Sequence, residues 1–358
     1  MSVFKQTDSK KTVLAKRIQL LMEDNWSQFA LNSFSPRNTP SPHTTNSTHK
    51  RVYQLVNEGE YSRAMKTLLS TAQPSDIGPD EIVTLQALHP SRNEPNHPLY
   101  TEIVTEESRS NAEPYVITPQ QTYRLICKSP KCVTPGIDGF RNEHKRSLAG
   151  KFQNPAEILF ITLYSQVLTL VANARIPSSI SILLGGAELI ALKQGAKTRP
   201  IALGYSIRKD VTTYITQSDT TKYIILNHLA PIQTGIGIPN GTEKIINQVT
   251  ASLQLDNNLH TLQSDNVNAF NSIERTHILS AYKTTLPNAY PFISSLMGPE
   301  TLLWMSTASN NAKTIISSSG SQQGDVAGSL SYALGLQPFL LGLDDILRNN
   351  KQRRQSSY

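Results

Sequence analysis

Two short apolar runs in the middle of the chain, at 187–192 and 198–203, constrain the fold most. They flank Lys193-Gln-Gly-Ala-Lys197, whose glycine suits a tight turn, so together they predict a β-hairpin. Pro200 in the second run has no backbone N–H, which restricts that run to an edge or irregular position. Most of the remaining chain shows helical patterns without strict strand–helix–strand alternation. This mixture predicts the α+β class, and no internal repeat is visible.

Capping signals and periodicity locate the other expected elements. Thr118-Pro119 and Asn154-Pro155 each place a capping residue before a proline, which is typical of a helix start. The stretch 90–117 is expected to be loop with room for one strand. Helices are expected at about 52–69, 82–88, 118–127, 154–176, 205–228 and 241–255, from about 273 and 288, and from about 323 to the end. Short strands are expected at Thr261–Asp265 and Lys313–Ser317.

The composition divides the chain into four regions. Residues 1–50 combine a basic segment, able to form one amphipathic helix, with a proline-rich linker at 33–48. Residues 51–150 are expected to form a helical N-terminal extension, and 151–345 a larger region that contains the hairpin. Residues 346–358 form a basic tail. A chain of 358 residues with 38% hydrophobic residues can bury a sizeable core, which excludes full disorder.

Charge and targeting signals indicate the partner and the compartment. The formal net charge of +7 favours polyanionic partners, nucleic acid above all, although many basic proteins bind none. No apolar segment follows the basic N-terminus, so no signal peptide is expected. Ile158–Ala174, a long uncharged stretch, contains several polar residues and indicates a buried helix of a soluble protein. We therefore expect an intracellular protein of the cytoplasm or nucleus, neither secreted nor membrane-spanning.

The two cysteines, Cys127 and Cys132, are too few for a disulfide framework and favour a reducing compartment. Their spacing could supply half of a zinc site. Because no second Cys/His pair with ligand spacing follows, zinc is not expected.

The hairpin turn carries a cluster of cations. Lys193, Lys197 and Arg199 lie close together in the sequence, and such a cluster suits a triphosphate or a phosphate backbone. Arg199 can bind an oxyanion through two nitrogens. The alternative is an ordinary solvated hairpin with lysines at its tip.

Three further segments carry residues suited to a site. Asp265 ends the expected strand 261–265 and could hold Mg²⁺ together with phosphate and water oxygens, or it could simply cap the turn, with Phe270 in the core. The segment Ser317–Gly328 is rich in serine and glycine before a helix, so its backbone could approach a phosphate, or it could be a flexible loop. Val133–His144 contains two glycine turns that lead into a helix.

Together, the order and spacing of these segments resemble the reverse transcriptase family, within it the non-LTR retrotransposon branch. The resemblance covers about 52–345, so that 151–345 would correspond to the fingers and a partial palm of a right-hand polymerase. Its motifs are Gly59-Glu-Tyr-Ser-Arg-Ala-Met-Lys-Thr-Leu68 with His89-Pro90, Thr134-Pro-Gly-Ile-Asp-Gly-Phe-Arg141, Leu192-Lys-Gln-Gly-Ala-Lys-Thr-Arg-Pro-Ile-Ala202, Thr234-Gly-Ile-Gly-Ile-Pro-Asn-Gly-Thr-Glu243, Asp265-Asn-Val-Asn-Ala-Phe-Asn-Ser272 and Gly320-Ser-Gln-Gln-Gly-Asp325.

The resemblance implies a role for the palm residues. Asp265 would coordinate two Mg²⁺ ions, or Mn²⁺, for in-line nucleotidyl transfer on an RNA template with a DNA primer and deoxynucleoside triphosphates. Phe270, five residues further on, would exclude a 2′-hydroxyl. Asn266 and Val267 would offer their backbone to the triphosphate.

The resemblance also implies a role for the fingers hairpin and the glycine-rich loop. Arg199 and Lys193 would neutralise the triphosphate of the incoming nucleotide, and Lys197 would contact nucleic acid. Gln323 and Gly324 would shape the floor of the nucleotide and template site.

One element of the family pattern is not recognised. The third palm motif, an aromatic residue followed by x-Asp-Asp, normally supplies the second metal carboxylate. The pair Asp344-Asp345 has no aromatic residue at the right place and lies too close to Gly324, so we expect it on the polar face of the final helix. Tyr358 would then end the chain before that motif and before any thumb.

Two functions remain open from the sequence. The chain could be an RNA-directed DNA polymerase, impaired or completed by another polypeptide, because one carboxylate is a poor site for two divalent ions. Alternatively, it could be a non-catalytic, nucleic-acid-binding remnant of a transposable element. An unrelated α+β binding domain is a third interpretation.

Overall fold

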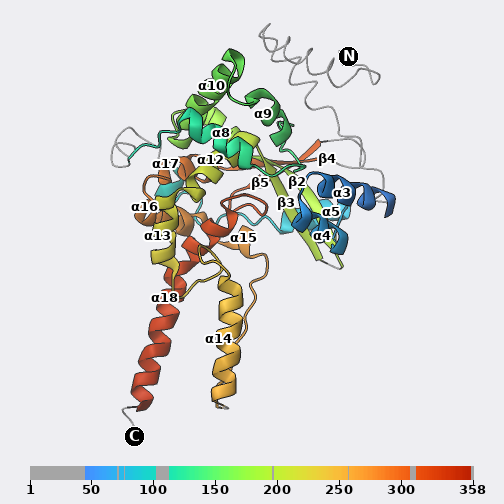
Figure 1. Ribbon diagram of the computed structural model, residues 1–358. Coiled ribbons are helices and arrows are strands. Elements are labelled where there is room, and N and C mark those ends of the chain that lie inside the picture. The colour runs from blue at the N-terminus through green and yellow to red at the C-terminus, as the bar shows by residue number, and fades with distance from the viewer. Residues whose placement is uncertain are drawn as a thin grey trace.

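The computed structural model describes residues 45–70, 72–75, 77–101, 113–195, 197–256, 258–306 and 312–355. The predicted N-terminal helix and most of the predicted linker lie outside these residues. The α+β class is confirmed: helices surround one mixed sheet (Figure 1). The helices are α3 (Thr45–Asn57), α4 (Tyr61–Leu69), α5 (Pro79–Ala87), α6 (Pro98–Thr101), α8 (Pro119–Lys128), α9 (Asn142–Ala149), α10 (Pro155–Ala172), α11 (Ser178–Gly185), α12 (Ser206–Gln217), α13 (Asp219–Leu229), α14 (Gly241–Leu255), α15 (Ala269–Ser272), α16 (Arg275–Thr285), α17 (Tyr290–Met297) and α18 (Gly328–Gln355).

The sheet is organised around the predicted hairpin. Its strands are β1 (Gln73–Pro74), β2 (Ala187–Gln194), β3 (Lys197–Gly204), β4 (Thr301–Ser306) and β5 (Ala312–Ser317). The strand β2 pairs antiparallel with β3 and β1 and parallel with β4, and β4 pairs antiparallel with β5. Within the sheet β3 pairs with β2 alone, so Pro200 occupies the edge position that the sequence predicts.

The two largest apolar cores of the described residues hold most of these elements together. The larger one lies among the helices and includes Leu168 of α10, Ile215 of α12, Tyr282 of α16 and Leu334 of α18. The smaller one covers one face of the sheet, where Leu85 of α5 packs against the buried positions of β2, β3, β4 and β5. Burial of this apolar surface holds α5 against the hairpin.

Local signals explain where several helices begin. Thr118 accepts a hydrogen bond from the backbone N–H of Gln121, and Asn154 accepts one from the backbone N–H of Glu157. In both helices a proline follows the cap, because the first helical position needs no N–H donor. The starts predicted for α8 and α10 are therefore confirmed.

A buried polar network links the three helices α9, α10 and α12. Lys145 of α9 donates to both carboxylate oxygens of Asp210 of α12 at 2.6 Å, and the hydroxyl of Tyr164 of α10 donates to the same carboxylate at 2.6 Å. Burial and the neighbouring carboxylate raise the pKa of Tyr164 well above its ordinary value. The network is internally paired, as buried charges require.

The prediction of a strand at Thr261–Asp265 is wrong. These residues have no strand conformation and their side chains are exposed. A strand forms only where a neighbouring strand accepts its backbone hydrogen bonds, and the described sheet does not extend to this segment. The predicted strand Lys313–Ser317 is confirmed as β5, whereas its partner β4 was not predicted.

Other boundaries differ for identifiable reasons. The helix predicted at 205–228 is two helices, because the side chain of Ser218 accepts the N–H of Thr221 and starts α13. The last helix begins at Gly328 instead of near 323, since Gly324 has a positive φ of 100°. The α3 helix begins at Thr45, within the predicted linker, and no strand occurs in the described residues of 90–117.

The prediction that the apolar stretch 158–174 forms a buried helix is only partly right. Among the described residues, α10 is the helix whose length and composition would allow it to cross a membrane, and 28% of it is buried. A core helix of a folded protein can meet the same two criteria. Leu168 and Val171 lie in the core, while Leu159 and Leu163 are exposed.

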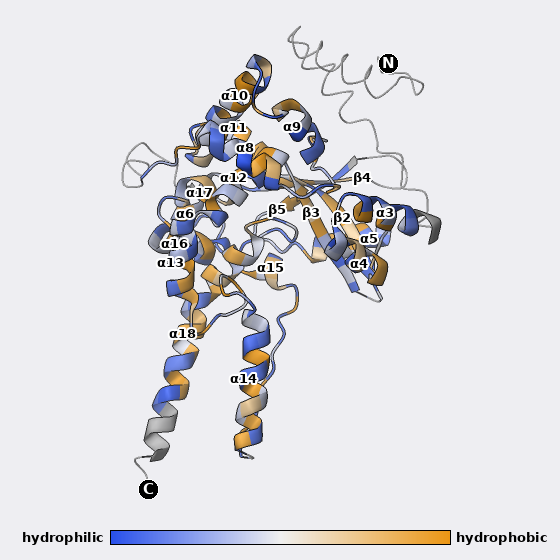
Figure 2. Cartoon of the chain, in the orientation of Figure 1, coloured by the Kyte–Doolittle hydropathy of each residue, from blue (hydrophilic) through white to orange (hydrophobic). Residues whose placement is uncertain are grey.

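Two helices project from the same end of the body, α14 and the C-terminal half of α18 (Figure 1). Figure 2 shows apolar residues along both. The exposed large apolar side chains include Ile245, Ile246, Val249, Leu253 and Leu255 on α14, and Phe339, Leu341, Leu343, Ile346 and Leu347 on α18. Asp344 and Asp345 lie within α18, as predicted, and Asp344 pairs with Arg348 one turn further on.

Candidate nucleotide and nucleic-acid site

The three cations predicted for phosphate binding do not share one face of the hairpin. In the β2–β3 register, Leu192 lies opposite Arg199, and Lys193 lies opposite Thr198. Because side chains alternate along a strand, Lys193 and Arg199 lie on opposite faces. Lys197 is exposed at the start of β3, and Arg199 is exposed two residues further on. The geometry therefore offers Arg199 and Lys197 to a ligand more directly than Lys193.

Lys193 is held by the N-terminal region. Its Nζ lies 2.5 Å from Oε1 of Glu81 on α5, and the two form an ion pair near the surface. The hydrogen bond from Lys193 lowers the pKa of Glu81. A triphosphate bound by Lys193 would have to compete with this carboxylate.

The edge of β3 is covered by the loop that contains Gln323 and Gly324. The backbone N–H of Ala202 donates to the carbonyl of Gln323 at 2.7 Å. Gly324 approaches so closely that a Cβ atom there would lie 2.9 Å from the carbonyl oxygen of Ala202. The structure thus brings Gln323 and Gly324 against the predicted fingers hairpin.

The same loop contacts the turn after Asp265. The backbone N–H of Ser321 donates to the carbonyl of Phe270 at 2.7 Å. Gly320 has a φ of 67°, and a Cβ atom there would lie 2.4 Å from Cα of Asn271. Gly320 is thus required both by its backbone conformation and by the space available.

Asp265 lies on an exposed loop that leads into this turn, and residues that follow it in the sequence are attached to the body. The side chain of Asn266 donates to the hydroxyl of Tyr332 on α18 at 2.8 Å. The ring of Phe270 lies against the ring of Tyr332, with centroids 5.5 Å apart. The side-chain amides of Asn268 and Asn271 both donate to the carbonyl of Leu88, the residue that follows α5.

One exposed carboxylate fits a magnesium ion that takes its other oxygens from phosphate and water. Within the described residues, no group of three or more His, Cys, Asp or Glu side chains could hold a metal ion. The metal role of Asp265 stays a prediction, and this segment offers a single exposed carboxylate for it.

Two buried arginines that sequence reasoning missed fix the loop 318–327. Arg208 of α12 donates to the carbonyl of Gly185 at 2.9 Å and to Oε1 of Gln322 at 3.1 Å, and it pairs with Asp325. Gln322 also donates to Gly185 at 2.8 Å. Burial lowers the pKa of Arg208 to about 10, so it remains charged at neutral pH.

Arg275, at the start of α16, holds the other end of the loop. It donates to the carbonyl of Gly320 at 2.9 Å and to the hydroxyl of Ser317 at 2.8 Å, and also to the carbonyls of Met297 and Pro299. Burial lowers its pKa to about 9. A single arginine within a helical pattern carries no sequence signal of this role, because its partners are three carbonyls and one hydroxyl from distant segments.

The segment 133–144, which contains two glycine turns, contacts the residues that connect β3 to α12. The carboxylate of Asp138 accepts the backbone N–H of Ser206 at 2.7 Å and thereby caps α12. Gly136 lies so close to Gly204 that a Cβ atom would be 2.0 Å from its carbonyl oxygen. This segment therefore supports the hairpin from the side of α12.

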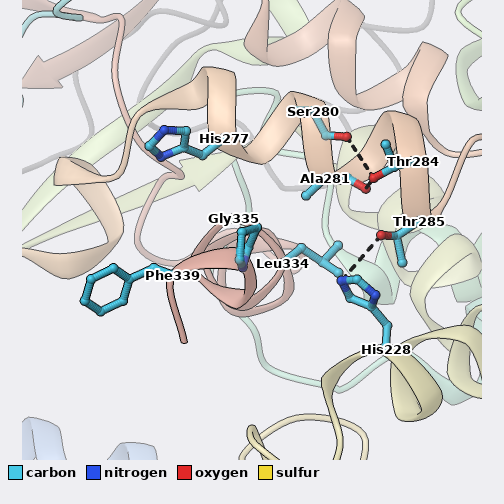
Figure 3. Close-up of a pocket in the computed structure, with 10 residues that line it drawn as sticks. His228, His277, Ser280, Ala281, Thr284, Thr285, Leu334, Gly335 and Phe339 are labelled. Carbon is cyan, nitrogen blue, oxygen red and sulfur yellow. Dashed lines mark hydrogen bonds between the residues drawn. The ribbon is translucent and has the colours of Figure 1, made fainter. Parts of the chain in front are cut away.

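A separate pocket of about 450 Å³ lies between α13, α16 and α18 (Figure 3). His228 and His277 lie toward opposite ends of it, and Nε2 of His228 lies 3.5 Å from the hydroxyl of Thr285. None of the residues predicted to bind metal, nucleotide or nucleic acid lines this pocket.

The histidine at the end of α5 predicts a pH dependence of stability. Burial lowers the pKa of His89 from its ordinary value of 6.5, while Nδ1 donates to the carbonyl of Leu85. The unfolded chain therefore binds a proton more readily than the folded one. The free energy of unfolding is therefore retained above about pH 6.5, and below that pH it falls by up to about 1.4 kcal/mol per pH unit.

Urea unfolding between about pH 7.5 and pH 5.5 measures this dependence. The variant His89→Asn keeps a donor near Leu85 and should show a shallower fall. His228, whose pKa burial also lowers, will contribute a remaining slope. An identical slope in wild type and variant would show that His89 does not couple to folding.

Neither a protein-family model nor a curated protein matches this sequence.

Proposed function

We propose that this chain is a reverse transcriptase-like protein that binds nucleotide and nucleic acid through the hairpin, the Asp265 turn and the Gln323–Gly324 loop. One observation carries the proposal: these segments, far apart in the sequence, contact one another. The backbone N–H of Ala202 donates a hydrogen bond to the carbonyl of Gln323, and the backbone N–H of Ser321 donates one to the carbonyl of Phe270. Such contacts are expected of a binding site assembled from several motifs.

The proposed roles follow from the chemistry of each group. Arg199 and Lys197 are exposed cations on the hairpin and would bind phosphate groups of nucleotide and template. Asp265 would hold Mg²⁺ together with the triphosphate, and the ion would supply charge stabilisation during transfer. Phe270, fixed beside the loop 318–327, would lie next to the sugar.

We propose that polymerisation by this chain alone is weak or absent. Transfer with two ions needs more than one carboxylate, and Asp265 supplies a single one from an exposed loop. A second carboxylate could come from another polypeptide. RNA template, DNA primer and deoxynucleoside triphosphates are the proposed partners.

The alternative function is non-catalytic binding of nucleic acid. The net charge of +7 and the exposed position of Asp265, outside any strand, favour it. In that case the affinity for RNA or DNA should fall steeply as salt rises, because bound phosphates release counterions. A filter-binding series in increasing salt measures this slope.

Primer extension on an RNA template with Mg²⁺ tests the catalytic proposal. We expect little or no incorporation by the purified chain, and we expect any incorporation that occurs to be lost in Asp265→Ala. The control Asp219→Ala removes an exposed carboxylate at the start of α13 and should leave incorporation unchanged. Incorporation that persists in Asp265→Ala would contradict the metal role of Asp265.

A further inference from the structure

The segment that carries Asp265 has unusual support. Residues 261–267 are exposed and belong to no strand, so sheet hydrogen bonds do not hold them. Leu262 and Val267 are almost fully exposed, at 97% and 91%. The position of Asp265 therefore depends on side-chain contacts made by its neighbours.

Two of those contacts converge on one residue, Tyr332. Its hydroxyl accepts the hydrogen bond from Nδ2 of Asn266 at 2.8 Å. Its ring lies against Phe270, with a centroid distance of 5.5 Å and an interplanar angle of 42°. Tyr332 thus contacts both Asn266, the residue after Asp265, and Phe270, five positions after Asp265.

Tyr332 can act as a fixed support because its helix is anchored on both sides. The next residue toward the N-terminus, Ser331, is buried and its hydroxyl lies 3.2 Å from that of Tyr282 on α16. Gly335 packs so closely on α16 that a Cβ atom would lie 3.2 Å from the side chain of Ile278. Movement of this part of α18 would disrupt the core.

We propose that Tyr332 is the positioning residue of the site, one that fixes both Asp265 and Phe270 relative to the loop 318–327. This inference rests on the proposed function. The hydroxyl orients Asn266 and hence the carboxylate next to it, whereas the ring fixes Phe270. Loss of the hydroxyl weakens the binding of Mg²⁺-nucleotide, and loss of the ring also relaxes the discrimination between deoxyribose and ribose.

Calorimetric titration of the purified chain with dGTP and with GTP, each in Mg²⁺, separates these two effects. The variants are Tyr332→Phe, Tyr332→Ala, Asn266→Ala and the double variant Asn266→Ala/Tyr332→Phe. Tyr223→Phe is the matched control, because Tyr223 is 70% exposed on α13, away from this contact.

Tyr332→Phe and Asn266→Ala should each weaken dGTP binding about 2- to 10-fold, the effect of one hydrogen bond. The double variant should be no weaker than either single one, since both remove the same bond. The ratio of dGTP to GTP affinity should be retained in Tyr332→Phe and fall about 3- to 10-fold in Tyr332→Ala. A merely structural role would weaken both nucleotides equally and leave the ratio unchanged.

Hydrogen exchange without nucleotide gives an independent readout. The backbone amides of Asn271, Ser272 and Ser321 are hydrogen-bonded in the contact beside Phe270 and should exchange faster in Tyr332→Ala. Three results would each overturn the role of Tyr332 and leave the proposed function standing. These are dGTP affinity at the wild-type level in Tyr332→Phe, an unchanged ratio of dGTP to GTP affinity in Tyr332→Ala, and unchanged exchange of these amides in Tyr332→Ala. A wild-type chain that binds neither nucleotide would overturn the proposed function, and this inference with it.

Discussion

The variant Arg208→Met is expected to lose about 3–5 kcal/mol of unfolding free energy, the usual cost of breaking a buried ion pair. Removal of the guanidinium leaves the carboxylate of Asp325 buried without its cation. It also removes a donor to Gln322 and to the carbonyl of Gly185. Few of these groups can reach water, so each unpaired one adds to the cost.

Urea denaturation of wild type and variant measures the loss. The matched control is Arg348→Met, which breaks the exposed pair with Asp344 on α18 and should change stability by less than about 0.5 kcal/mol. The double variant Arg208→Met/Asp325→Leu should recover part of the loss, because no charge then remains buried. Equal stability of Arg208→Met and wild type would contradict the buried pairing.

The variant Gly320→Ala is expected to lose about 3 kcal/mol or more. An alanine at a φ of 67° costs about 1–2 kcal/mol through its backbone conformation. In addition, its Cβ atom would lie 2.4 Å from both Cα of Asn271 and the carbonyl oxygen of Phe270. Since these are backbone atoms, the turn after Asp265 must move away from the loop, and the contact proposed to form the nucleotide site opens.

The control for this substitution is Gly342→Ala. Gly342 lies inside α18 with open space around its missing side chain, so alanine should stabilise the helix by about 0.5–1 kcal/mol. Thermal and urea unfolding of both variants provide the comparison. A loss below about 1 kcal/mol in Gly320→Ala would show that the turn and the loop are not packed as described.

Signals that act within a few residues predicted the local structure well. The turn at Gly195 with the paired runs around it predicted the β2–β3 hairpin, and Pro200 predicted its edge position. Side-chain caps at Thr118 and Asn154 predicted two helix starts, because these interactions involve neighbours only three residues away.

The segment 261–265 shows the limit of such reasoning. Its composition suits a strand, but a strand requires a partner, and the partner is a property of the tertiary structure. The same holds for Lys193, whose sequence context suggests a phosphate ligand although the register directs it toward Glu81 of α5. Arg208 and Arg275 were missed for the same reason, since their partners lie in other segments.

By itself, the sequence determined the α+β class, the hairpin, most helices and the motifs that suggest a nucleotide site. Only the tertiary structure decided which of those motifs touch one another and which side chain supports them. The physical reason is the distance along the sequence between the residues that interact. Turns and caps are decided by local hydrogen bonds, whereas the contact of Phe270 with Ser321 and of Asn266 with Tyr332 depends on how buried surfaces bring distant segments together.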